Sequence, residues 1–305
     1  MKILLLFTFF LANVVVCMGQ INMKDSTVQV IGFWDRNEKQ SYTVKHEEYK
    51  VSKGDTTSRV LYTYDVDITI IDSTAKSYAI QWDYSNFNVE SEQPFMKRLI
   101  EASKLNRAII KTNELGVFEE LVNWKEVREE TMRLFKVLQK EFKEIPNFDS
   151  LLKQQMALFQ SKASIEASLI EEIQQFYTFH GGVYKYGVDI ESKTQFPNKY
   201  GGKPFDAEVV IWVDTLNATD SYSTICMTNT VDSVQLRDAT YKYLTNMAST
   251  LSFPLPKKED FPSFKNITYT TAQIHNWGWI ISSIVTKEVE ADNMLKVEEQ
   301  IIEIK

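Results

Sequence analysis

The feature that most constrains the fold is a strict alternation of apolar and polar side chains in the first third of the chain. The apolar members, which fall on one side of an extended chain, are Val60, Tyr62, Tyr64, Val66, Ile68 and Ile70. The polar members on the other side are Thr63, Asp65, Asp67 and Thr69. A period of two residues predicts a strand of an antiparallel sheet with one solvated face. The following segment repeats the pattern with Tyr78, Ile80, Trp82 and Tyr84, so neighbouring strands can line one apolar face.

Further strands are expected on both sides of this pair. Residues 27–87 divide into four strands at polar turns such as 52–55 and 72–74. In the second half of the chain, strands are predicted over residues 184–192, 205–216, 221–231, 267–274, 279–289 and 295–304. Residues 62–68 and 184–190 carry Tyr, Tyr, Val, Asp and Ile at matching places. Duplication and independent alternation both explain this similarity, and both predict that the two segments are sheet.

A helical block is expected between the two groups of strands, at about residues 122–180. A short helix over about residues 92–103 and a hairpin over 108–117 with a turn at Gly116 precede it. Asn123 with Glu126 forms an N-cap pattern, which predicts the start of a long helix. Its apolar stripe consists of Trp124, Val127, Thr131, Leu134, Leu138 and Phe142. Pro146 would end this helix, and Asp149 would cap a second one that runs to Gly181, giving a helical hairpin.

One more helix is predicted from Asp232 and Gln235 to about residue 251. Its expected inner face consists of Leu236, Ala239, Tyr243 and Met247. Together these elements predict an α+β fold, in which a curved, half-barrel-like antiparallel sheet carries the helical hairpin and further helices on one face. Residues 20–305 are expected to form a single domain, because no change in composition marks a linker.

Residues 1–19 have the pattern of an export signal. Lys2 supplies the positive charge, residues 3–16 are apolar, and Cys17 and Gly19 are the small residues before a cleavage site at Gln20. The apolar run is shorter than the ~20 residues that span a bilayer, so we expect no transmembrane span after cleavage. The protein is therefore predicted to be exported, to the periplasm or cell surface of a Gram-negative bacterium. Lipoprotein anchoring at Cys17 is the less favoured alternative, because Val16 stands where such signals carry a small residue.

Charge and cysteine content exclude several classes of function. The formal charge of the whole chain is −7 at pH 7, and removal of Lys2 with the leader gives −8 (−7 − 1). Because nucleic-acid binding depends on clustered Lys and Arg, we expect no nucleic-acid partner. Cys226 is the only cysteine after the leader, so no intramolecular disulfide can form, and its strand-like neighbours predict a small buried side chain.

The chain has no sequence motif for a catalytic centre, a cofactor or a metal ion, so none is predicted. Asp65 and Asp67 are interpreted as members of a solvated strand face. His180, at a predicted helix end, is expected to be a cationic cap that interacts with the helix dipole. Enzymatic function is the less favoured hypothesis, with a carboxylate-based hydrolase as its most plausible form.

Aromatic side chains are the remaining signal for a binding site. They pack cores, and they also line pockets for apolar ligands. The residues expected to contact a ligand are Trp82, Tyr186, Trp212, His275, Trp277 and Trp279. Asp followed by Ser or Thr recurs, for example at Asp25, Asp55 and Asp232, and resembles the acceptor of a bacterial O-glycosylation system. The same pairs are also ordinary turn and capping residues, so both interpretations stay open.

The stretch Thr-Asn-Glu-Leu-Gly at 112–116, leading to Asn123 and Trp124, resembles uncharacterised exported envelope proteins of Gram-negative bacteria. The expected architecture resembles the half-barrel carriers of the LolA/LolB type, in which an open sheet wraps helices around an apolar cavity. This resemblance implies a non-enzymatic envelope protein that binds a lipid or another apolar or amphipathic ligand between sheet and helices. A structural or interaction protein with an envelope protein partner is the alternative.

Overall fold

The computed structural model describes residues 20–92, 97, 100, 105–144, 148–196, 198, 200, 202–251 and 254–305. The export signal with Cys17, most of the short helix predicted over 92–103, and Pro146 lie outside these residues. Within the described part of the chain, no helix has the length and apolar character needed to cross a membrane.

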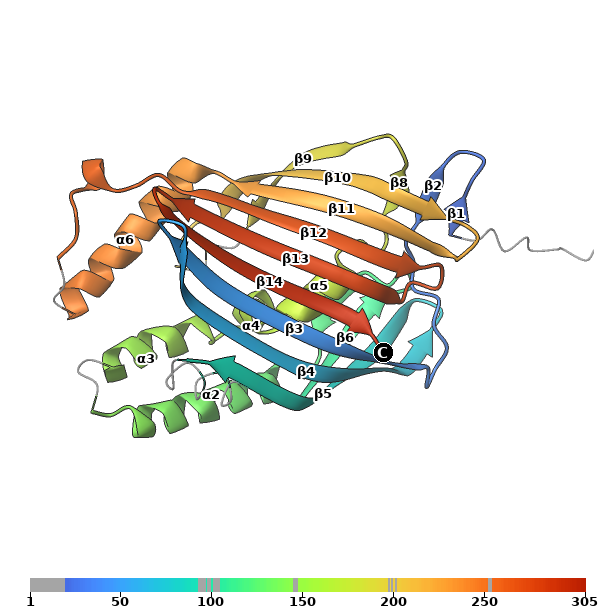
Figure 1. Cartoon of the computed structure of the whole chain (residues 1–305). Coiled ribbons are helices and arrows are strands. Elements are labelled where there is room, and N and C mark those ends of the chain that lie inside the picture. Colours follow the sequence, from blue (N-terminus) through green and yellow to red (C-terminus); the bar gives the residue numbers. More distant parts are fainter. Residues whose placement is uncertain are drawn as a thin grey trace, which may run out of the picture.

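Eleven strands form one antiparallel sheet in the order β7-β6-β5-β4-β3-β14-β13-β12-β11-β10-β9, which leaves β7 and β9 as its two edges (Figure 1). The N-terminal strands are β3 (Lys39–Ser52), β4 (Asp55–Thr74), β5 (Ser77–Ser91), β6 (Arg107–Asn113) and β7 (Phe118–Leu121). The C-terminal strands are β9 (Ile190–Phe196), β10 (Phe205–Asn217), β11 (Tyr222–Val231), β12 (Lys265–His275), β13 (Ile280–Ala291) and β14 (Met294–Ile304). Pairing of β14 with β3 joins the two groups, so the last strand of the chain lies in the middle of the sheet.

A second, three-stranded sheet lies at one end of the large sheet (Figure 1). It consists of β1 (Ile21–Asn22), β2 (Thr27–Gln29) and β8 (Val183–Lys185). The prediction of one strand over 184–192 was wrong, because the chain leaves β8 through a turn at Gly187 (φ +76°) and enters β9 in the other sheet. The sequence similarity between 62–68 and 184–190 therefore does not extend to the structure.

The helices are α2 (Trp124–Glu141), α3 (Phe148–Leu158), α4 (Lys162–Leu169), α5 (Glu171–Tyr177) and α6 (Ser233–Leu251), with a short 3-10 turn at Lys258–Asp260. The prediction of one continuous helix after Asp149 was wrong, because the chain forms α3, α4 and α5 there. Ser161 starts α4 with a capping box: its side chain accepts a hydrogen bond from the backbone N–H of Ser164. A second break follows at Ile170, which frees α5 to turn onto the sheet.

Two predicted helix starts have different outcomes. Gln235 donates its backbone N–H to Asp232 Oδ1 over 2.8 Å, which confirms the cap of α6. Asn123 stands at the N-cap of α2, but its Oδ1 accepts the N–H of Ile109 at 2.8 Å instead of a helix N–H. Its side chain therefore joins the helix start to β6. The predicted inner face of α6 is only partly correct, because the helix leaves the end of the sheet and only Leu236 of its four members is buried (Figure 1).

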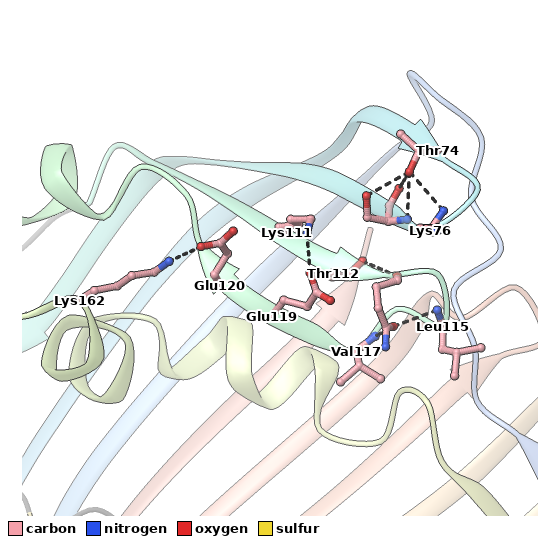
Figure 2. A network of polar contacts seen from close by, with 11 residues as sticks. Thr74, Lys76, Lys111, Thr112, Leu115, Val117, Glu119, Glu120 and Lys162 are labelled. Atoms are coloured by element: carbon pink, nitrogen blue, oxygen red, sulfur yellow. Dashed lines mark hydrogen bonds and ion pairs between the residues drawn. The ribbon is translucent and has the colours of Figure 1, made fainter.

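The β6–β7 edge of the sheet is pinned to α4 and to its own turn, as Figure 2 shows. Lys162 of α4 forms an ion pair with Glu120, and the backbone N–H of Leu121 donates to Glu166 of α4 at 2.7 Å. In the turn, Asn113 Oδ1 accepts the N–H groups of Leu115 and Val117 at 2.9 and 3.0 Å. The stretch 112–116 is therefore a self-capped hairpin turn that places β7 against α4.

The hydrophobic core lies between α5 and the inner face of the sheet. The register pairs Ile68 with Trp82 and Ile70 with Ile80, and all four side chains are buried, as the alternation predicted. Phe176 of α5 packs edge-on against Tyr42 and Trp82, with ring centroids 5.4 Å away in both cases. The same alternation corrects the prediction for Cys226. Because Ile225 is fully buried, Cys226 points to the outer face, where it is half-exposed, with Sγ 3.5 Å from Thr271 Oγ1.

Candidate functional site

The inner face of the sheet changes character along the strands. One half carries the apolar core, and the next rows carry polar and charged side chains that we call the polar band: His46, Glu48, Lys287, Lys296, Glu298 and Gln300. The register fixes this arrangement. Gln300 lies opposite His46, and Glu298 lies between Glu48 and Lys287. Since Val44 and Ile302 form the adjacent buried row, the band continues the same face of the sheet beyond the core.

Helix α5 spans the boundary between the core and the polar band. Its first residue, Glu171, forms an ion pair with Lys287 at 2.7 Å. Gln175 donates to Ser283 Oγ at 3.0 Å and to the Gln300 carbonyl at 3.3 Å. The helix holds this position because its apolar side chains are buried in the core, among them Ile173 and Phe176. The apolar side of α5 thus anchors the helix, and its polar side completes the band.

Glu172 is the most perturbed carboxyl group at this boundary. It is 8% exposed, and its Oε1 accepts a hydrogen bond from the Tyr84 hydroxyl at 2.5 Å. Burial raises the pKa of Glu172 to about 7, although the hydrogen bond from Tyr84 opposes the rise. Near neutral pH this carboxyl group therefore exchanges between its protonated and ionised forms.

An aromatic ladder runs along the inner face beside the band, and it consists of His46, Tyr62, Tyr64 and Phe87. His46 stacks on Tyr62 with centroids 4.6 Å apart, and Tyr64 stacks on Phe87 at 5.0 Å. Burial lowers the pKa of His46 below its ordinary value, with Glu298 opposing the shift, so the imidazole is neutral at neutral pH. A neutral imidazole above phenol rings gives a flat, weakly polar surface for a ligand.

The charged members of the band are paired and partly solvated. Lys296 lies 2.6 Å from Glu298 and 3.2 Å from Glu48. Burial alone would raise the pKa of Glu298, but the hydrogen bond and charge of Lys296 reverse this and hold the pKa below its usual value. The side chains of Lys287, Lys296 and Glu298 keep 33%, 35% and 30% of their surface exposed. Water therefore reaches this part of the inner face, in contrast to the sealed core beside it.

The structure does not gather the six residues predicted to bind a ligand into one site. Trp82 and Trp279 belong to the core, with Trp279 Nε1 donating to Glu38 at 2.5 Å. His275 and Trp277 meet in the β12–β13 turn, with ring centroids 5.2 Å apart. The other two are separate: Tyr186 is exposed in the turn after β8, and Trp212 lies opposite Cys226 on the outer face of the sheet.

The prediction for His180 was wrong. The ring is buried, and its Nε2 lies 2.8 Å from the carbonyl oxygen of Gly278. Burial lowers the pKa of His180 to about 4, so it is neutral and does not cap a helix as a cation. Asp65 and Asp67 lie on the solvated outer face as predicted, hydrogen-bonded to Lys305 and Lys39, respectively, with their pKa values lowered by these contacts. Within the described ranges, no group of three or more His, Cys, Asp or Glu side chains is arranged to hold a metal ion.

Sequence reasoning missed the polar band because it searched for aromatic residues. A usable signal was present in β3, where Tyr42, Val44, His46 and Glu48 share one face. A polar residue on the face that should be buried indicates either a partner or a functional site. Glu172 gave no such signal, because its burial depends on where α5 docks.

Two open grooves are lined in part by Asp206 of β10, close to the start of α6, and no member of the polar band lines either groove. The larger, about 1030 Å³, is bordered by the ends of β9–β13 and residues 263–266. The smaller, about 920 Å³, lies between α6 and the loop after β9. Their common wall is fixed by Gln235, which donates to Asp206 Oδ2 at 2.7 Å.

The fold and the polar band define an α+β protein with an open antiparallel sheet and helix α5 packed against its inner face. No family model and no curated protein matches the chain. A lipovitellin structure that describes lipid–protein interactions resembles it with a TM-score of 0.40 at 9% identity, covering 90% of this chain and 25% of lipovitellin. This chain thus spans a quarter of that protein's length. A structure described as an exported protein with a YmcC-like fold, from Bacteroides fragilis, has a TM-score of 0.23 at 10% identity, with 90% and 99% coverage of the two chains.

Proposed function

We propose that this protein is a non-enzymatic, exported binding protein of the cell envelope that holds an amphipathic ligand between the sheet and its helices. The observation that carries the proposal is the solvated inner face, where stacked rings stand beside charged side chains. A buried wall with no binding role would not combine them, because removing charged groups from water is unfavourable. In this proposal the sheet acts as a half-barrel, and the helices limit access to its inner face.

The aromatic ladder and the polar band would contact different parts of the ligand. Apolar chains would lie on His46, Tyr62 and Phe87, which are the partly exposed rings of the ladder and offer wide, flat surfaces. The charged groups stand in opposite pairs, such as Lys287 and Glu171 at 2.7 Å. A ligand group that bound only one member would leave the other without its partner. We therefore expect a lipid-like ligand whose polar head carries both a positive and a negative charge.

Binding of fluorescent amphiphiles tests this proposal. The protein, expressed with its own leader and purified from the exported fraction, is titrated with a fluorescent zwitterionic lysophospholipid and, for comparison, with a fluorescent fatty acid. Saturable binding of both probes, with the zwitterionic probe the tighter, is expected. Absence of saturable binding would contradict the proposed function, and a tighter fatty acid would contradict the assignment of the head group.

A pair of matched variants locates the site. Tyr62→Ala removes a ring from the inner face, and Tyr269→Ala removes one from the exposed outer face of β12. We expect the Tyr62 variant to weaken binding about tenfold, since it loses an aromatic stacking surface. The Tyr269 variant should bind as the wild type does. Equal losses in both variants would place the probe elsewhere, and circular dichroism checks that both are folded.

A structural or interaction role is the second candidate, and the edge strand β9 favours it. Six of its seven residues are exposed, and no strand among the described residues pairs with its outer side. Exposed strand edges can pair with a strand of another protein. A photo-crosslinker at Ser192 should then capture one envelope protein repeatedly from intact cells. If no protein is captured while lysophospholipid binding is present, this second role is contradicted.

A further inference from the structure

Large apolar side chains are exposed at the end of the molecule that carries the small sheet. We call them the apolar tip: Met23, Phe33, Val183, Tyr186 and Trp277. The exposed fractions of Phe33, Val183 and Trp277 are 67%, 59% and 59%. Large exposed apolar side chains that gather at one end of a protein mark a site where it meets another molecule or a membrane. None of these side chains belongs to the polar band, so the tip needs its own explanation.

Backbone contacts show that the members of the tip lie on neighbouring segments. Phe33 donates its backbone N–H to the Trp277 carbonyl at 3.2 Å. Val28 and Val30 are buried, so the side chains of the odd-numbered residues from Gln29 to Phe33 point outward. Val183 pairs with Gln29 in the small sheet and is exposed as well. At the other end of this sheet, Tyr186 donates its N–H to Ser26, in the turn that contains Met23. Figure 1 shows β1, β2 and β8 together at this end.

The tip is built on a rigid base. A Cβ on Gly278 would lie 2.4 Å from the Ile31 carbonyl oxygen, which shows how closely the β12–β13 turn approaches the chain near Phe33. The Gly278 carbonyl also lies 2.8 Å from His180 Nε2 in the core. Exposed rings on a rigid backbone can bind a partner or a membrane without a large loss of conformational entropy.

The chain enters the structure at this tip. The Gln20 side chain donates from Nε2 to the Ile31 carbonyl at 2.6 Å, two residues before Phe33. The export signal predicted over residues 1–19, with its apolar run at 3–16, directly precedes this point. Cys17, the alternative lipid attachment site, is three residues earlier, a reach of about 10 Å for extended chain. A lipid on Cys17 would hold this end of the protein at a membrane, whereas cleavage before Gln20 would leave the exposed side chains of the tip to make the contact.

We propose that the apolar tip inserts into the interfacial region of a phospholipid bilayer, so that the protein stands on the membrane by this end. Trp and Tyr rings favour the membrane–water interface, because they combine an apolar body with a polar group. Exposed charges of both signs flank the tip, including Lys24, Asp25, Lys185 and Asp189. Insertion should therefore depend on apolar contact and only weakly on anionic lipid. The inference does not depend on the proposed ligand site, which lies beyond the sealed core.

Quenching of tryptophan fluorescence by brominated phospholipids tests the insertion directly. All six tryptophans lie in the described residues, and Trp277, with 59% of its surface exposed, is the most exposed one among them. The exported protein is mixed with phosphatidylethanolamine–phosphatidylglycerol vesicles that carry bromine on the acyl chains. We expect quenching in the wild type, its loss in Trp277→Phe, and its retention in Trp212→Phe. Comparable quenching in both variants, or none in the wild type, would overturn the proposal.

Vesicle partitioning provides a second readout with a matched control. Replacing Phe33 and Val183 by Ser should lower the partition coefficient at least tenfold, since each loses apolar surface that insertion would bury. Val234→Ser changes an equally exposed residue on α6, 66% exposed, and should leave partitioning unchanged. A lipid on Cys17, detected by intact mass, would be common to all variants, so their comparison still decides. If the protein self-associates and Phe33→Ser abolishes this, the tip binds a second copy of the chain instead of a membrane. If a crosslinker at residue 33 captures another protein, the tip binds that protein instead, and either result would overturn the proposal.

Discussion

Replacing Glu172 by Gln should make the protein more stable at alkaline pH and change little at acidic pH. In the folded protein, burial raises the pKa of this carboxyl group to about 7, against 4.5 for an ordinary Glu. The folded state therefore binds the proton more tightly than the unfolded chain does. Its stabilising contribution is complete below pH 4.5 and is lost as the pH rises through 7. Gln keeps the shape and an acceptor for Tyr84 but has no proton to lose.

The size of the effect follows from the separation of the two pKa values. Each unit corresponds to about 1.4 kcal/mol, so ionising Glu172 in the folded state costs roughly 3 kcal/mol at high pH. Between pH 5 and pH 8, the advantage of the Gln variant in free energy of unfolding should grow by about 2 to 3 kcal/mol. The titratable groups that face Glu172 are Tyr62 and Tyr64 from β4, Tyr84 from β5, and Glu171 beside it. Burial raises the pKa values of all three tyrosines, so they stay protonated over this range.

Urea unfolding followed by circular dichroism at several pH values measures this difference. The difference between variant and wild type cancels the titration of other groups, including His46 and His180. Glu171→Gln is the matched control, since it makes the same chemical change one residue away in a partly exposed ion pair with Lys287. The control should show no such gain at pH 8. An advantage of the Glu172→Gln variant that does not change with pH would refute the reasoning that burial shifts the pKa of this carboxyl group.

Three further outcomes are expected. The ring of His180 should titrate near pH 4 by NMR instead of near 6.5. Because the folded state holds this ring neutral, its contribution to stability is complete above pH 6.5 and is lost as the pH falls through 4, which should lower the free energy of unfolding by about 3 kcal/mol. Gly278→Ala should lower the free energy of unfolding in urea by more than about 2 kcal/mol, because φ is +80° and the new Cβ would meet the Ile31 carbonyl. Trp82→Ala should cost about 3 to 5 kcal/mol in the same assay, since Trp82 is fully buried against Phe176.

The strands could be predicted from sequence more completely than the helices. The alternation in β4 and β5 predicted both the strands and their buried face, because successive side chains of a strand point to opposite faces of the sheet. The breaks in the helical block depend on the cap at Ser161 and on the docking of α5 onto the sheet. The spacing of apolar residues along the chain shows neither of these. The separation of β8 and β9 was missed for a similar reason, because the alternation of apolar and polar residues continues through the turn at Gly187.

The candidate site was hardest to predict, because its members come from β3, β13, β14 and α5. Trp82 and Trp279 were predicted to contact a ligand, but the structure places both in the hydrophobic core. Tyr186 and Trp277 were selected for an internal cavity and instead lie on the exposed tip. The sequence thus indicated which aromatic residues are unusual without indicating on which surface they lie.

By itself, the amino-acid sequence determined the antiparallel strands, the polarity of their faces and the positions of the main helix starts, because these follow from contacts between residues close in the chain. Tertiary structure alone decided that β14 joins the two groups of strands, that His180 is a neutral core residue, and that Glu172 is buried beside Tyr84. The physical reason is that burial and pKa depend on groups far apart in sequence. Glu172 and Tyr84 are 88 residues apart, and only the docking of α5 onto the sheet brings them together.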